Sequence, residues 1–164
     1  GSYFHVADTI LQMDHYNPVD MPAFAKKEAE AFPSIQPSAP TGAVADYRRV
    51  IQPDPAFRPD RRLKMKVLGM DSISVNHDSI DLRCLEQLAD QEQIQALSAI
   101  LCYVERRLFN GKDTLQQIID QLDKELSARG LEILSEGGRL APNLAMPRIQ
   151  EVYACINRYR GLKI

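Results

Sequence analysis

The chain has 164 residues, of which 45% are hydrophobic and 26% charged, and its formal net charge is −2 at pH 7. This length predicts one domain with an extension. The balanced charge excludes a globally basic nucleic-acid binder and an acidic disordered tail. The sequence has no run of 18 apolar residues and no signal-peptide pattern at its start, so we expect a cytoplasmic protein without a membrane span.

Cysteines and histidines show no spacing typical of a disulfide framework or a metal site. The three cysteines are far apart, and no two histidines stand four residues apart on a helix. The sequence therefore predicts reduced cysteines in the core of a cytosolic protein and no bound metal.

Three regions follow one another along the chain. Residues 1–20 hold one short apolar segment, in which Thr9–Met13 is predicted as a strand. Residues 21–60 hold a short helix at 23–32 and a proline-rich stretch at 33–60, predicted as an extended linker or a strap on the surface. Eight of the ten prolines fall between Pro18 and Pro59, and proline disfavours helix interiors and central strands.

Residues 61–164 are predicted to form one small α+β domain. Alternation of apolar and polar residues at 63–68 and 72–76 predicts a β-hairpin or small meander. Four helices are expected after it: 82–89 with Asp81 as N-cap, a second from Asp90, a third from Asp113 to Gly130, and a last one from Pro147. Capping-box patterns mark two of these starts, since Gln93 follows Asp90 and Gln116 follows Asp113 by three residues. Residues 131–146 are predicted to be irregular.

Basic residues are concentrated near the start of this domain. If 63–67 is a strand, Lys64 and Lys66 point to the same face and form a positive ridge for nucleic-acid phosphates. The alternative is a solvated edge strand, whose lysines discourage pairing with another chain. The candidate nucleic-acid-binding residues are Arg58, Arg61, Arg62, Lys64 and Lys66.

Polar residues of the last helix form a second group. Cations near a helix C-terminus are favourable by themselves, which explains part of the group. The alternative is an interface with another chain, for which the candidates are Arg148, Asn157, Arg158 and Arg160.

No motif for nucleotide binding or catalysis is complete. Gly111 and Lys112 resemble the end of a phosphate-binding loop, but Arg106 stands where its first glycine is required, and Asp113 stands where Ser or Thr is required. The run 134–138 (LSEGG) resembles the signature of ABC-type ATPases, but it leads into a poor helix start. We therefore expect no catalytic residue, no cofactor-binding residue and no metal ligand in this chain.

Three blocks of sequence resemble one family. Residues 3–9 (YFHVADT) resemble the stretch before the last core strand of ABC-type ATPases. Residues 80–93 (IDLRCLEQLADQEQ) and 147–160 (PRIQEVYACINRYR) are similar to blocks of the bacterial "predicted ATPase of the ABC class" family. The resemblance implies that 1–20 is the terminal strand segment of a missing ATPase core, and that the full-length protein uses ATP and Mg.

The same resemblance implies the partners of the chain, which are the missing N-terminal and ATPase-core domains, RNA and a second copy in a homodimer. On this basis we expect 61–164 to be an RNA-binding or dimerisation module without ATPase activity of its own. The alternative is a structural cap that stabilises the ATPase core.

Overall fold

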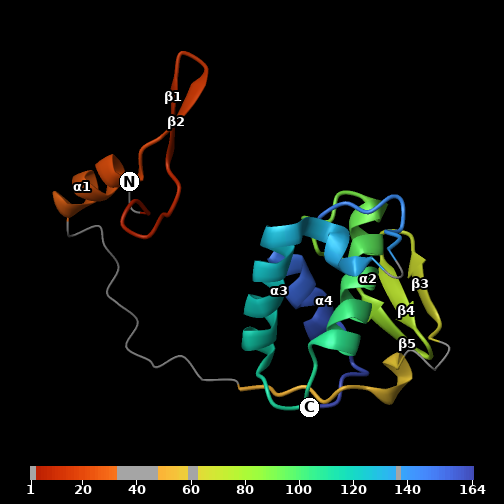
Figure 1. The fold of residues 1–164 in the computed structure, drawn as a ribbon. Helices are drawn as coiled ribbons and strands as arrows, with labels where there is room; N and C mark the ends of the chain where they lie inside the picture. The colour runs from red at the N-terminus through yellow and green to blue at the C-terminus, as the bar shows by residue number, and fades with distance from the viewer. Residues whose placement is uncertain (1–2, 33–47, 59–62, 136–137) are drawn as a thin grey trace. The chain divides into compact units, whose positions relative to one another are not determined.

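The computed structural model describes residues 3–32, 48–58, 63–135 and 138–164. The chain divides into two compact units, residues 1–45 and 46–164 (Figure 1). Across the described residues the structure contains two small antiparallel sheets and four α-helices. The predicted α+β class is therefore confirmed.

The N-terminal unit is built on one hairpin and one helix. Strands β1 (Leu11–Asp14) and β2 (Asn17–Asp20) pair antiparallel. His15 and Tyr16, both with positive φ, form the two-residue turn that fits the twist of a hairpin. Helix α1 (Pro22–Glu30) has proline in its first turn, where the missing N–H costs nothing. The strand predicted at Thr9–Met13 begins instead at Leu11, and its partner is β2 of the same unit.

Beyond residue 62, the C-terminal unit begins with a three-stranded sheet. Strands β3 (Met65–Leu68), β4 (Ser72–Val75) and β5 (Asp78–Asp81) form an antiparallel meander in chain order. The first two confirm the predicted hairpin. The three strands together form the small meander predicted as the alternative, although no strand was predicted at 78–81, because only one of its four residues, Ile80, is buried. Its pairing with β4 therefore leaves almost no alternation to detect in the sequence.

The helix predicted at 82–89 is absent, and this segment forms turns. Asp81 ends β5 instead of capping a helix, and its carboxylate accepts from the backbone N–H and the guanidinium of Arg83. The backbone N–H of Leu82 donates to Asp71 O at 2.7 Å, which extends the sheet by one residue. Cys84 has a φ of +64°, which interrupts any helix. Tertiary pairing therefore overrides the local helical pattern.

Three α-helices and a 3-10 turn complete the unit. Helix α2 (Gln91–Arg107) begins at Asp90 with the predicted capping box. Helix α3 (Leu115–Arg129) ends at Gly130 as predicted and leads into the 3-10 helix η3 (Gly130–Leu134). Helix α4 (Ile149–Arg158) begins after Arg148, so Pro147 lies just before the helix rather than at its first position.

The capping box of α3 is Thr114 with Gln117, one residue later than predicted. The side chain of Asn110 accepts hydrogen bonds from the backbone N–H groups of Lys112 and Asp113 and so stabilises the turn before the helix. The predicted cap, Asp113, lies inside this turn. Asp113 thus belongs to the turn and not to the helix.

Helices α2 and α4 cover one face of the sheet, α2 against β3 and β4 and α4 against β5 (Figure 1). Residues 48–58 also belong to this packing. Ile51 and Phe57, the latter in the 3-10 helix η2 (Pro55–Phe57), are 2% and 1% exposed and lie in the core. Gln52 pairs with Lys163 near the end of the chain. This described part of the proline-rich stretch is therefore bound along the domain.

Candidate functional site

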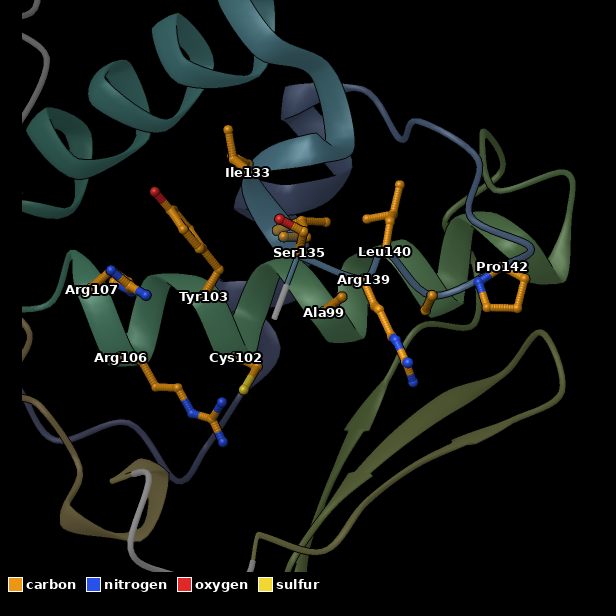
Figure 2. Close-up of a pocket in the computed structure, with 12 residues that line it drawn as sticks. Ala99, Cys102, Tyr103, Arg106, Arg107, Ile133, Ser135, Arg139, Leu140 and Pro142 are labelled. Carbon is orange, nitrogen blue, oxygen red and sulfur yellow. The ribbon is translucent and has the colours of Figure 1, made fainter. Parts of the chain in front are cut away.

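An open cleft of about 940 Å³ lies between α2 and the segment that follows α3. One wall is the outer side of α2, and the other is the end of η3 with residues 139–142 (Figure 2). The described residues that line it are Ala99, Cys102, Tyr103, Arg106, Arg107, Ile133, Leu134, Ser135, Arg139, Leu140, Ala141 and Pro142.

The cleft is basic. Its described lining contains three arginines and no carboxylate. Arg106 and Arg107 lie at one end of the cleft, on the last turn of α2, and Arg139 lies on the opposite wall (Figure 2). Arg107 and Arg139 are exposed to solvent, whereas Arg106 is half-buried and its Nε donates to Phe57 O at 3.0 Å. The side chains of Arg107 and Arg139 are therefore exposed and accessible to an anionic ligand.

Tyr103 gives this cleft an ordered aromatic wall. Its hydroxyl donates to Glu125 Oε2 at 2.6 Å, and Gln121 Nε2 donates to the other carboxylate oxygen of Glu125. Burial and the hydrogen bond to Glu125 raise the pKa of Tyr103, so the phenol stays neutral. The ring is therefore held by α3 and remains uncharged at physiological pH.

The predicted basic cluster is only partly brought together. Lys64, just before β3, and Lys66 within it are exposed, and Met65 between them is half-buried, so both lysines do share one face. The strand is also an edge of the sheet, as the alternative reading requires. Arg58 is exposed and lies at a different, smaller cavity. Arg61 and Arg62 lie outside the described residues.

Three of the four candidate interface residues make contacts within the chain. Arg158 Nη1 donates to the backbone oxygens of Asp81 and Arg83, at 3.0 and 2.8 Å. Asn157 accepts from Arg49. These two residues thus fasten α4 to the end of β5 and to the 48–58 segment.

Arg148 binds the carboxylate of Glu151, a residue that is only 4% exposed. The guanidinium donates through Nε and Nη2, and the backbone N–H of Arg148 donates to the same carboxylate. Arg160 is exposed.

The smaller cavity, of about 170 Å³, lies between residues 53–58 and the end of α2. Glu105 lines it and is 3% exposed. Its Oε2 accepts weakly from the backbone N–H of Asp54 at 3.3 Å, and its Oε1 has no hydrogen-bond partner among the described residues. Burial raises the pKa of Glu105 to about 7, and the hydrogen bond from Asp54 opposes that rise.

Neither cavity was predicted from the sequence, although one signal for Glu105 was present. Glu105 stands four residues after Leu101, on the apolar stripe of α2, where a carboxylate is out of place. The cleft had no such signal, because Arg139 and the α2 arginines come from segments about thirty residues apart whose approach depends on tertiary packing.

Fold and site together define a small α+β domain that presents a basic, partly apolar cleft. Residues 64–164 match the family model described as the MRB1590 C-terminal domain. Because the match spans more than half of the chain, the chain belongs to this family. No curated protein matches the chain.

The predicted membership of an ABC-class ATPase family is wrong. The family match over 64–164 is to the MRB1590 C-terminal domain. One of the blocks behind the prediction, 80–93, was also expected to contain the starts of two capped helices. In the structure, its first half forms the end of β5 and turns instead. The opening block precedes a strand that already has its partner in β2.

None of the helices within the described ranges is both long enough and apolar enough to cross a membrane.

Proposed function

We propose that residues 46–164 form an RNA-binding domain whose binding surface is the basic cleft between α2 and residues 133–135 and 139–142. The observation that carries the proposal is that two exposed arginines, Arg107 and Arg139, line opposite walls of one open cleft. Membership of a family associated with RNA binding supports RNA as the ligand.

Arg107 and Arg139 would bind phosphates of the RNA backbone. Guanidinium groups recognise phosphate oxygens through paired N–H donors, and contacts of this type fix the position of a strand without reading its sequence. The two residues stand on opposite walls of the cleft (Figure 2). A strand that runs along the cleft would meet one guanidinium group on each wall.

Single-stranded RNA fits this surface better than a duplex. Leu140 is 41% exposed, and Ala141, Pro142 and the ring of Tyr103 line the same cleft. Apolar and aromatic surfaces of this kind pack against unstacked bases, which a duplex keeps inside its helix. The mixture of arginines and apolar groups therefore favours a flexible strand.

Fluorescence anisotropy with a labelled single-stranded RNA and a duplex of equal length tests the proposal. The full chain is expected to bind the single strand more tightly. Arg107→Ala with Arg139→Ala is expected to weaken binding by about a hundredfold or more, because the variant removes two charged contacts and each contributes about 1.5–3 kcal/mol.

Lys112→Ala with Lys124→Ala is a matched control, because it also removes two positive charges, but from exposed positions that do not line the cleft. Lys64→Ala with Lys66→Ala tests the predicted ridge on β3 in the same assay. Equal losses in the cleft and control variants would show that binding depends on net charge only and would contradict a site in the cleft. A loss confined to the β3 variant would move the site to the ridge.

A further inference from the structure

The cavity beside Glu105 has the properties of a site for one small planar group. Its volume of about 170 Å³ is below the 300–1,000 Å³ typical of pockets for larger ligands. Its lining combines the rings of Phe57 and Phe109 with charged groups: Asp54, Arg58, Glu105 and Arg106. Aromatic or apolar side chains beside polar groups that bind the base edge are the usual surroundings of an extruded base.

The unsatisfied oxygen of Glu105 specifies the kind of ligand. Buried polar atoms almost always have a hydrogen-bond partner, and leaving one without a partner is costly. Oε1 of Glu105 is such an atom among the described residues, and its residue lines the cavity. A ligand that enters the cavity and presents an N–H donor would satisfy this oxygen.

Position links this cavity to the basic cleft. Arg106 lines both cavities. Its Nε donates a hydrogen bond to the backbone oxygen of Phe57, a residue that also lines the smaller cavity. Arg58 lines the smaller cavity and is exposed, so its guanidinium is available for a phosphate outside the cavity. The two sites are therefore neighbours at the end of α2, with Arg106 common to both.

We propose that the cavity between residues 53–58 and the end of α2 binds a guanine base of the RNA, with Glu105 Oε1 accepting hydrogen bonds from the N–H groups of the base edge. This inference rests on the proposed RNA-binding function. Guanine is favoured because its Watson–Crick edge places two N–H donors side by side. Adenine, cytosine and uracil place an acceptor atom next to their donor, which would face and repel the carboxylate.

The first test uses short uridine oligonucleotides that carry a single central guanine, adenine, cytosine or uracil. At pH 8, above the raised pKa of Glu105, the full chain is expected to bind the guanine oligonucleotide about fivefold more tightly than the others. That factor is the low end of the discrimination of a base-edge contact, chosen because one carboxylate oxygen already binds Asp54.

Glu105→Gln is expected to abolish this preference without weakening binding to the uridine oligonucleotide. The amide oxygen would take the place of Oε2 at the backbone N–H of Asp54, and the NH₂ group would then face the donors of guanine. Glu86→Gln, the same change at an exposed position, is the matched control and should keep the preference.

The second test uses guanosine, its 5′-monophosphate and uridine 5′-monophosphate without any RNA. Guanosine monophosphate is expected to shift the amide signals of Asp54 and Phe109 in two-dimensional NMR spectra of the full chain, and uridine monophosphate is not. Arg58→Ala is expected to make guanosine and its monophosphate bind equally, because only the phosphate contact is lost. This variant keeps the test valid if Glu105→Gln does not fold.

Four outcomes separate the two proposals. A guanine preference that Glu105→Gln abolishes supports the cavity. RNA binding without this preference, or with a preference that survives Glu105→Gln, overturns the cavity and leaves the cleft in place. Guanosine monophosphate binding without RNA binding overturns the RNA function and keeps a nucleotide site. Absence of both overturns both.

Discussion

Glu105→Gln should raise the stability of the domain by an amount that depends on pH. Burial raises the pKa of Glu105 to about 7, against an ordinary value of 4.5. The hydrogen bond from the backbone of Asp54 and the charge of Lys163 oppose this rise, and the charge of Asp54 adds to it. Tyr159, which also interacts with this carboxyl group, has its own pKa raised to about 12, mainly by burial, and stays neutral below pH 9. The pH dependence between pH 4 and 8 at this position therefore comes from Glu105.

The sign follows from the protons that each state holds. Below pH 4.5 the carboxyl is protonated in both the folded and the unfolded chain. Between pH 4.5 and about 7 the unfolded chain releases the proton and the folded chain keeps it, so stability falls as the pH rises. At about 1.4 kcal/mol per pH unit, this interval corresponds to a loss of about 3 kcal/mol, which is complete above pH 7.

Urea unfolding of the wild type and Glu105→Gln at five pH values from 4 to 8 measures this effect. The neutral amide does not titrate, so the difference in free energy of unfolding between the two proteins should be near zero at pH 4 and about 3 kcal/mol at pH 8. All other titratable groups cancel in the difference. A difference that is constant across the range would refute a buried carboxyl with a raised pKa.

Two further substitutions test how the fold is held together, both by thermal or urea unfolding. Arg158→Ala should destabilise the domain by about 1–2 kcal/mol, because it removes the donor to the carbonyl oxygens of Asp81 and Arg83 at the end of β5. The control, Arg160→Ala at an exposed position, should change stability by less than about 0.5 kcal/mol. Equal effects of the two substitutions would show that the Arg158 contacts are not formed in solution. Thr114→Ala should cost about 1 kcal/mol through loss of the observed helix cap, and a larger loss from Asp113→Ala than from Thr114→Ala would return the cap to the position predicted from sequence.

The sequence was sufficient where local and tertiary preferences agree. The apolar stripes of α2 and α3, the capping box at Asp90 and the glycine at 130 all predict the helices that are observed. Alternation at 63–76 likewise predicts β3 and β4, since one face of each strand is more deeply buried than the other. In these segments the hydrophobic period and the end signals specify the same structure.

Prediction failed where long-range pairing decides the structure. Residues 82–89 carry a helical pattern, but the hydrogen bond of Leu82 to Asp71 and the contact of Arg158 with Asp81 and Arg83 hold this segment at the end of the sheet. The Arg158 contacts join residues 75 and 77 positions apart, so no local window of sequence contains them. The cleft was missed for the same reason, because Arg139 reaches α2 only after the chain turns through η3.

The salt dependence of RNA binding tests the central claim most directly. A plot of the logarithm of the association constant against the logarithm of salt concentration has a slope of about 0.7 per phosphate neutralised on a single strand. If Arg107 and Arg139 each bind a phosphate in the cleft, Arg107→Ala with Arg139→Ala should make that slope shallower by about 1.4 relative to the wild type. A slope that is unchanged in this variant, with wild-type affinity, would contradict RNA binding in the cleft.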